Sequence, residues 1–253
     1  MRPNKLRALI ADRAPILCGW LSVPSSYLAE GAGHAGYDCV AVDLQHGMIG
    51  FEAAVGMLQA ISATPAVPIV RAPALDAHSI MHLLDAGAYG VICPMISTAE
   101  DIRELLAACR YPPVGKRSFG PARGKLYGGA DYFDHANEAV LVIPMIETAE
   151  ALDNIDDILA VPGLDMIYIG PNDLALELGE RPNAEIEDSK TAKAIAHILA
   201  QATKASIPVG IFCASPELAR QRLDEGFVMM TPGNDFALAT GAMASAVKRT
   251  LER

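Results

Sequence analysis

The chain has 253 residues, 51% of them hydrophobic, which is enough apolar material for a sizeable buried core. Its formal net charge of −10 argues against nucleic acid or an anionic membrane surface as a partner. The first residues lack the apolar segment of a signal peptide, and no apolar run reaches the roughly 18 residues of a membrane span, so we expect a cytoplasmic enzyme that acts on small molecules.

Short apolar runs alternate with segments of helical periodicity along the whole chain. After a lead-in helix at 3–12, strands are predicted at 16–23, 37–44, 67–71, 90–95, 140–146, 164–170, 207–213 and 227–231. Helices are predicted at 25–35, 51–63, 76–86, 98–109, between 150 and 164, just after 172, and at 185–205, 216–225 and 235–251. The stretch 111–128 is rich in Gly, Pro, Lys and Arg and is predicted to be a long irregular loop, which is usually functional or mobile.

This order gives eight strand-then-helix units with no linker between them. Alternation of this kind predicts a parallel sheet covered by helices, and eight units favour a closed barrel, whose typical length is about 250 residues. The strands are continuous apolar runs, as expected for strands buried on both faces. We therefore predict an α/β fold, a (β/α)8 TIM barrel, with residues 1–253 forming a single domain.

The cysteines are odd in number and include no C-x-x-C pair. They lie mostly within apolar runs, at Cys18, Cys39, Cys93, Cys109 and Cys213. This pattern predicts reduced core cysteines in a reducing compartment.

Two consecutive predicted strands lead into a carboxylate. The run from Val140 ends at Glu147, and the run from Leu164 ends in Gly-Pro-Asn-Asp at Asp173. With one helix between them the strands are expected to be parallel neighbours, so both carboxylates lie at the same edge. Oxygen ligands without Cys or His nearby suit Mg²⁺ or Mn²⁺, with Co²⁺ also possible, better than zinc. The alternative is that Glu147 caps the helix beginning at Thr148 and Asp173 opens the next helix.

Other polar side chains follow the remaining strands. Because barrel active sites lie at the C-terminal strand ends, these residues are expected to share one mouth. Reading off the ends gives Trp20; Asp43, Gln45 and His46; Arg71; Pro94; Glu147; 170–173; Phe212; and Thr231. A lone histidine at such a place is more often structural, but the set as a whole predicts a site.

This set suits chemistry on a 2-keto acid. A divalent ion on Glu147 and Asp173 could hold the acid through a carboxylate oxygen and the keto oxygen, and could stabilise the enolate charge. Arg71 offers a permanent forked donor to the same oxygen. The set therefore predicts reversible carbon–carbon bond formation through an enolate.

The remaining polar groups supply binding and proton transfer. The backbone N–H groups of Asn172 and Asp173, at a helix start, could hold the substrate carboxylate. His46, oriented by Asp43, is the candidate general base or acid. No lysine ends a predicted strand, which argues against a Schiff-base mechanism.

At these residues the chain resembles the HpcH/HpaI aldolase family, the class II pyruvate aldolases, and within it the hydroxy ketoacid aldolase branch. The resemblance runs from Leu17 to the last helix, with the motifs in the family's order. They are 42–47 (VDLQHG), 68–71 (PIVR), 83–88 (LLDAGA), 115–123 (GKRSFGPAR), 145–148 (MIET), 169–174 (IGPNDL) and 210–213 (GIFC).

The resemblance implies a metal-dependent barrel that adds pyruvate or hydroxypyruvate to an aldehyde, giving a 4-hydroxy-2-keto acid. It implies the metal ligands, enolate donor and proton-transfer pair named above, and substrate contacts from Gln45, Gly170, Pro171, Asn172, Asp173, Phe212 and Trp20. It further implies a homohexamer, a trimer of dimers whose final helices are exchanged, with interface residues Asp85, Arg117 and Arg123. Asp85 and parts of the 111–128 loop are expected to reach a neighbouring subunit's site. Two departures, Gln45 for a frequent Glu and Met145 for an occasional Gln, put aldehyde choice and metal affinity in question.

Several alternatives stay open on the sequence. Lys116, Arg117 and Arg123 could instead be a solvated basic face, or Arg117 or Arg123 could meet an anionic aldehyde substrate or an interface carboxylate. Phe212 lines the aldehyde pocket or packs in the core. The function could be that of an acyl-CoA lyase of the citrate or malyl type, although no stretch for a nucleotide tail is evident, or that of a non-catalytic keto-acid-binding barrel.

Overall fold

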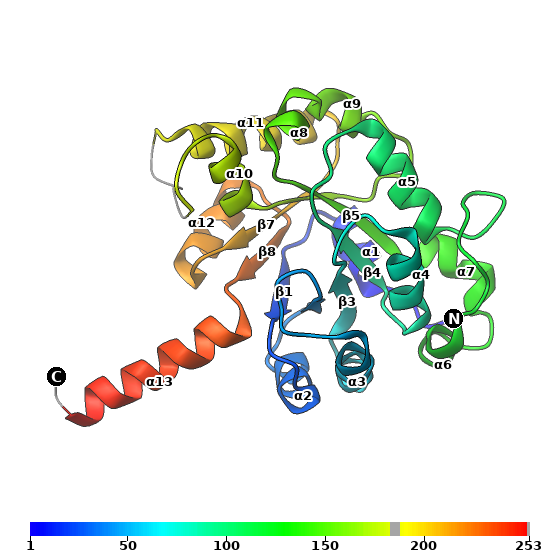
Figure 1. The fold of residues 1–253 in the computed structure, drawn as a ribbon, viewed down its shortest axis with the longest axis horizontal. Helices are drawn as coiled ribbons and strands as arrows, with labels where there is room; N and C mark the ends of the chain where they lie inside the picture. Colours follow the sequence, from blue (N-terminus) through cyan, green and yellow to red (C-terminus); the bar gives the residue numbers. More distant parts are fainter. Residues whose placement is uncertain (183–187, 252–253) are drawn as a thin grey trace.

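Eight parallel strands close into one barrel, in which each strand pairs with its neighbours in sequence and β8 pairs with β1 (Figure 1). The computed structural model describes residues 1–182 and 188–251. The strands are β1 (Ile16–Leu21), β2 (Cys39–Asp43), β3 (Val67–Arg71), β4 (Gly90–Cys93), β5 (Leu141–Ile146), β6 (Ile167–Ile169), β7 (Val209–Cys213) and β8 (Met229–Pro232). The predicted (β/α)8 barrel is confirmed.

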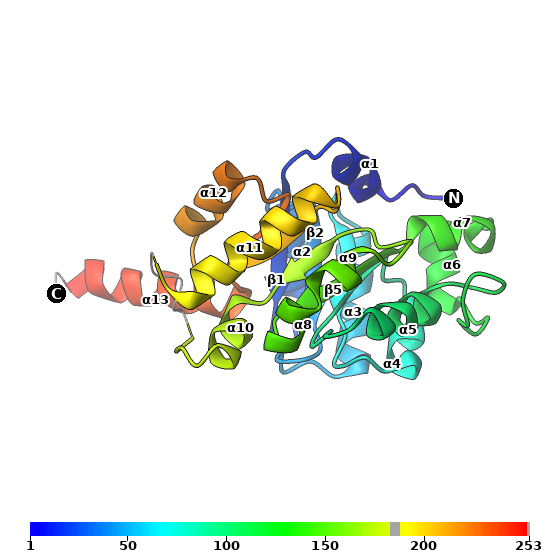
Figure 2. The same cartoon turned by 90° about the horizontal axis from the view of Figure 1, so that it is seen from above.

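Helices surround the barrel on its outside (Figures 1 and 2). Those that match predicted segments are α1 (Lys5–Ala11), α2 (Ser26–His34), α3 (Phe51–Ser62), α4 (Ala77–Asp85), α5 (Ala99–Cys109), α10 (Pro171–Glu177), α11 (Lys190–Lys204), α12 (Pro216–Glu225) and α13 (Asp235–Leu251). Helix α11 was predicted from residue 185, and 185–187 lie outside the described residues.

Two hydrophobic cores hold these layers together. One lies inside the barrel and includes Trp20, Met145 and Tyr168, and the other lies between the strands and the helices. Every residue of β2, β3, β4, β5 and β6 is buried, as expected for strands covered on both faces. All five cysteines are buried, and none of them forms a disulfide.

Helix α1 packs against the N-terminal ends of the strands. Its N-cap residue Asn4 donates to the carbonyls of Tyr89 and Ala139, which precede β4 and β5, at 3.0 and 2.8 Å. Arg7 donates to the carbonyl of Val140 at 2.7 Å, and Leu6 is fully buried. These contacts cover the end of the barrel opposite the predicted site.

The segment between β4 and β5 differs from the prediction. Within the expected loop lies α6 (Ala122–Gly128), and α7 (Tyr132–Ala139) follows it. A Cβ on Gly128 would lie 2.5 Å from the Tyr132 ring, so this glycine permits the two helices to pack closely. The single helix predicted between β5 and β6 is two short ones, α8 (Ala149–Asp153) and α9 (Ile155–Leu159). Tertiary packing, which the local sequence does not reveal, explains the helical form of this Gly-rich stretch.

Helix α13 points away from the barrel in both views (Figures 1 and 2). It has no buried residue, and its large apolar side chains are exposed. They are Phe236, Leu238, Met243, Val247 and Leu251. Among the described residues, no helix combines the length and apolar character that a membrane crossing needs.

Candidate active site

The C-terminal strand ends surround a cavity of about 330 Å³. Its lining comes from every strand end except that of β4: Trp20, Ser22, Asp43, His46, Arg71, Met145, Glu147, Gly170, Pro171, Asn172, Asp173, Phe212, Asn234 and Phe236. The barrel therefore brings the two predicted metal-binding carboxylates, the arginine and the histidine to one space.

Glu147 is fully buried at this cavity, immediately after β5. Its Oε1 accepts a hydrogen bond from the backbone N–H of Met95 at 2.8 Å, and Met95 adopts a left-handed conformation with φ of 57°. The cap of α8 is Thr148, whose side chain accepts from the N–H of Ala151. The alternative that Glu147 caps this helix is therefore wrong.

The second oxygen of Glu147 is the unusual one. Oε2 is buried and has no hydrogen-bond partner among the described residues, and a Cβ on Gly170 would lie only 1.9 Å from it. The pKa of Glu147 is raised to about 7: burial is the largest cause and the nearby charge of Asp173 adds to it, while the Met95 N–H and Arg71 act in the opposite direction. An ionised Glu147 in this position requires a nearby positive charge.

Asp173 lies in the first turn of α10 and lines the same cavity. Its carboxylate makes no hydrogen bond or ion pair with any residue in 1–182 or 188–251. Together with the unsatisfied Oε2 of Glu147, it forms an all-oxygen donor set of the kind that hard divalent cations prefer. The residues present fit such an ion.

Asp43 and Arg71 form a buried pair beside the carboxylates. Arg71 donates through Nε to Oδ1 of Asp43 at 2.8 Å and through a terminal nitrogen to Oδ2 at 2.5 Å. Trp20 Nε1 donates to Oδ2 at 3.2 Å, and the Arg71 guanidinium lies 4.9 Å from the centre of the Trp20 ring. Burial acts to raise the pKa of Asp43, but the hydrogen bonds and charge of Arg71 outweigh it and lower the pKa. The guanidinium is thereby held in one orientation at the cavity wall.

His46 lies in the turn after β2, and Asp43 orients it through the backbone. Oδ1 of Asp43 accepts from the N–H of His46 at 3.2 Å and from the N–H of Gln45 at 3.0 Å. The His46 side chain lines the cavity, whereas Gln45 is not among the lining residues and its Oε1 is buried without a partner in the described part of the chain. The substrate contact predicted for Gln45 stays a prediction.

The predicted interface residues lie away from the cavity. Arg117 is 1% exposed, donates to Asp85 at 2.8 Å and to the Tyr132 hydroxyl at 3.1 Å, and lies over the Tyr111 ring. Arg123 donates to the carbonyl of Ala86 at 2.9 Å. The alternative of a solvated basic face is wrong for Arg117, because its charge is paired within its own chain. The interface roles stay predictions.

Sequence reasoning missed three lining residues, Ser22, Asn234 and Phe236. Each lies one to four residues beyond the last residue of its strand, in a turn whose direction the strand pattern does not specify. The polar Gly233–Asn234–Asp235 segment between β8 and the last helix was the available signal. Phe212 lines the cavity and packs edge-on against Trp20 at 5.7 Å between ring centroids, and its predicted role in the aldehyde pocket stays a prediction.

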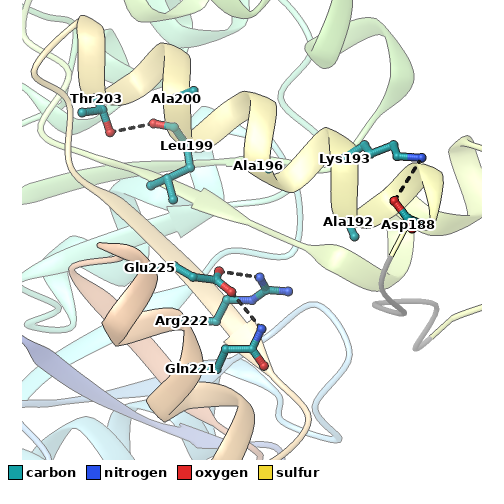
Figure 3. Close-up of a pocket in the computed structure, with 10 residues that line it drawn as sticks. All are labelled: Asp188, Ala192, Lys193, Ala196, Leu199, Ala200, Thr203, Gln221, Arg222 and Glu225. Atoms are coloured by element: carbon teal, nitrogen blue, oxygen red, sulfur yellow. Dashed lines mark hydrogen bonds and ion pairs between the residues drawn. The ribbon is translucent and has the colours of Figure 1, made fainter.

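A larger hollow of about 1100 Å³ lies outside the barrel, between α11 and α12 (Figure 3). Its charged side chains pair with one another: Lys193 lies 3.7 Å from Asp188, and Arg222 donates to Glu225 at 2.6 Å. None of the residues that line this hollow lies at the end of a strand. The cavity at the barrel mouth is therefore the better candidate for catalysis.

Fold and site define a (β/α)8-barrel enzyme with an acidic pair and a fixed arginine facing one cavity. Residues 17–242 match the model of the HpcH/HpaI aldolase/citrate lyase family. The chain belongs to this family, whose members generally depend on a divalent metal.

Individual relatives match this chain over nearly its whole length. A hydroxypyruvate/pyruvate aldolase of Rhizorhabdus wittichii is 44% identical over 96% of this chain and 97% of its own. A 4-hydroxy-2-oxovalerate aldolase of Novosphingobium aromaticivorans is 36% identical over 99% and 95%. The crystal structure of a family member from Burkholderia cenocepacia J2315 matches with a TM-score of 0.92 and 33% identity over 98% and 99% of the two chains.

Proposed function

We propose that this protein is a class II aldolase that reversibly adds the enolate of pyruvate or hydroxypyruvate to an aldehyde, forming a 4-hydroxy-2-keto acid. The observation that carries the proposal is the buried Oε2 of Glu147, which has no partner in the described chain and lies in one cavity with Asp173 and Arg71. The names of the relatives from R. wittichii and N. aromaticivorans support the same reaction class.

Glu147 and Asp173 would hold the divalent ion, which we propose to be Mg²⁺ or Mn²⁺, with Co²⁺ as a further possibility. When bound, such an ion acts as a Lewis acid towards the oxygens of the keto acid. It also supplies the positive charge that an ionised, buried Glu147 requires.

The chain's own groups bind the keto acid and stabilise its enolate. Arg71 carries a permanent charge, and its orientation is set by two hydrogen bonds to Asp43, so its remaining N–H groups are available to the developing oxyanion. The backbone N–H groups of Asn172 and Asp173 lie in the first turn of α10, at the positive end of the helix dipole, and they would hold the substrate carboxylate.

His46 would transfer the proton. Its side chain lines the cavity on the β2 side, and Asp43 holds its backbone. An imidazole can remove the C3 proton of the keto acid, or return a proton to the new hydroxyl group, directly or through one water molecule.

The test is aldol cleavage and synthesis with and without metal. Pyruvate with an uncharged aldehyde, and hydroxypyruvate with the same aldehyde, should give product with added Mg²⁺ or Mn²⁺. Activity should be lost in EDTA and restored by either ion. Full turnover by the metal-stripped protein would refute the metal-dependent mechanism, and keto-acid binding without turnover would favour a non-catalytic barrel.

We also propose that the chain forms the hexamer expected from the resemblance, in the cytoplasm, with α13 exchanged between subunits. The exposed apolar side chains of α13 support a partner surface. A groove of about 360 Å³ beside the start of α13, lined by small residues such as Gly31 and Ala32 of α2 and its C-cap residue Ala35, is a suitable acceptor. Light scattering should give six chains of 26.7 kDa, and Val247→Asp should lower that mass.

A further inference from the structure

The turn between β8 and α13 brings Asn234 to the active-site cavity, and the first turn of α13 brings Phe236 there. In the closed barrel β8 lies between β7 and β1, so these two residues continue the wall formed by Phe212 and Trp20. The acidic pair lies after β5 and β6 and Arg71 ends β3, so a keto acid bound there leaves the β7–β8–β1 wall to face the second substrate. The wall consists of Phe212, Asn234, Phe236, Trp20 and Ser22.

Asp235 fastens this turn to the end of β1. Its Oδ1 accepts from the N–H and the hydroxyl of Ser22 at 2.8 and 2.7 Å, and Oδ2 accepts from the N–H of Val23 at 3.1 Å. Oδ1 also accepts from the N–H of Phe236 at 2.8 Å. These bonds place the first turn of α13 over the cavity, although the rest of that helix leaves the barrel (Figure 1).

Asn234 has one group left for a ligand. Its Oδ1 accepts from the N–H of Ala237 at 2.8 Å and so caps α13. Its Nδ2 has no hydrogen bond to any residue that the structure describes. A carboxamide whose oxygen is already used for capping presents N–H donors alone.

The charges around the cavity are distributed unevenly. The lining residues that carry or can acquire a charge are Asp43, His46, Arg71, Glu147 and Asp173, and all of them follow β2, β3, β5 or β6. The β7–β8–β1 wall has three aromatic rings and no cationic side chain. An aldehyde bearing a carboxylate would place it against these rings, where Asn234 offers a neutral donor but the wall has no cationic side chain to balance the charge.

We propose that Phe236 and Asn234 are the aldehyde-specificity residues and that they select uncharged aldehydes, Phe236 by contact with the carbon chain and Asn234 by donating to a hydroxyl oxygen. Asp235 is a positioning residue that holds both. This inference rests on the proposed aldolase function. The measurements therefore include a partial reaction that needs only the keto acid, namely exchange of the pyruvate methyl protons with D₂O followed by NMR.

The first experiment is Phe236→Ala, assayed with pyruvate and propanal. We expect kcat/KM for propanal to fall about tenfold, through KM, because the contact between the ring and the carbon chain is lost. Proton exchange into pyruvate should equal that of the wild type. Phe133→Ala, an exposed phenylalanine on α7 that is not in the cavity lining, is the matched control and should leave both readouts unchanged.

The second experiment separates the roles of Asn234, Asp235 and Phe236. Asn234→Ser retains a helix-capping oxygen and removes the amide donor, so it should reduce the preference for glycolaldehyde over propanal. Asp235→Asn should raise KM for both aldehydes without changing proton exchange. Phe236→Arg adds a cation to the wall and should raise the ratio of kcat/KM for succinic semialdehyde to that for propanal.

The outcomes distinguish this inference from the proposed function. Wild-type protein that neither exchanges pyruvate protons nor forms product would refute the aldolase assignment itself. Wild-type protein that does both, together with Phe236→Ala and Asn234→Ser variants whose aldehyde KM values and selectivity are unaltered, overturns the specificity assignment alone. The same holds if wild-type protein prefers succinic semialdehyde to propanal.

Discussion

Gly170→Ala is the substitution with which the structure makes its sharpest prediction. The backbone of Gly170, at φ −98° and ψ 90°, is open to alanine, so only space matters. The new Cβ would lie 1.9 Å from Oε2 of Glu147 and 3.0 Å from the Met145 methyl. Oε1 of Glu147 is bonded to the Met95 N–H, so the carboxylate can move only by losing that bond or by shifting buried neighbours.

The expected cost follows from that geometry. Overpacking a well-packed site costs about 1–3 kcal/mol. For a chain of this size that corresponds to a melting temperature lowered by roughly 2–12 °C, at about 2–4 °C per kcal/mol. Displacement of the Glu147 carboxylate should weaken cation binding by at least about tenfold. This is the smaller end of the loss in metal affinity that follows when a group supporting a metal ligand is removed.

Two assays measure these effects on the same preparations. Thermal melts followed by circular dichroism report stability, and calorimetric titration with Mn²⁺ reports affinity. The control is Gly56→Ala in α3, where the nearest heavy atom, a Ser26 carbon, is 4.0 Å away, and where alanine should stabilise by about 0.5–1 kcal/mol. If Gly170→Ala protein has the same melting temperature and the same Mn²⁺ affinity as the wild type, the placement of Oε2 is refuted.

Four further predictions concern the side chains of the site. Because burial raises the pKa of Glu147 from 4.5 to about 7, protons compete with the cation, and Mn²⁺ affinity should fall as the pH is lowered through 7; a flat profile would contradict this. The same raised pKa means that Glu147 contributes about 3 kcal/mol of stability to the metal-free protein below pH 4.5, and this contribution is lost as the pH rises through 7. In denaturant unfolding at the two pH values, the difference between wild-type protein and Glu147→Gln should change by that amount. Arg71→Lys loses the forked contact with Asp43 and should lower kcat by about 10²-fold in steady-state assays while Mn²⁺ binding persists. His46→Ala should slow pyruvate proton exchange by about 10²–10⁴-fold with the metal still bound, and loss of the metal instead would disprove its role in proton transfer.

Most of the fold was predictable because its signals are local. Continuous apolar runs such as 67–71 and 90–93 mark strands buried on both faces, whatever the rest of the chain does. Helix α5 begins with a capping box formed by Thr98 and Asp101, which can be read from four residues. Helix α6 was missed because its glycines are poor helix formers, and its packing against Tyr132 compensates for that.

The sequence by itself determined that acidic side chains follow two neighbouring parallel strands, because hydrophobic periodicity and connection length specify strand direction. It also determined that Arg71 and His46 emerge at the same edge. Hydrophobic patterning thus defined the positions of the catalytic candidates before any contact was known.

Only the tertiary structure decided the pKa values, orientations and contacts of those groups. The Met95 N–H reaches Glu147 across 52 residues of chain, Asp43 binds Arg71 across 28, and Asp235 binds Ser22 across 213. The pKa of Glu147, the fixed orientation of Arg71 and the aromatic wall that Phe236 completes depend on such contacts. The physical reason is that burial and electrostatic environment are properties of space, and residues distant in the chain supply them.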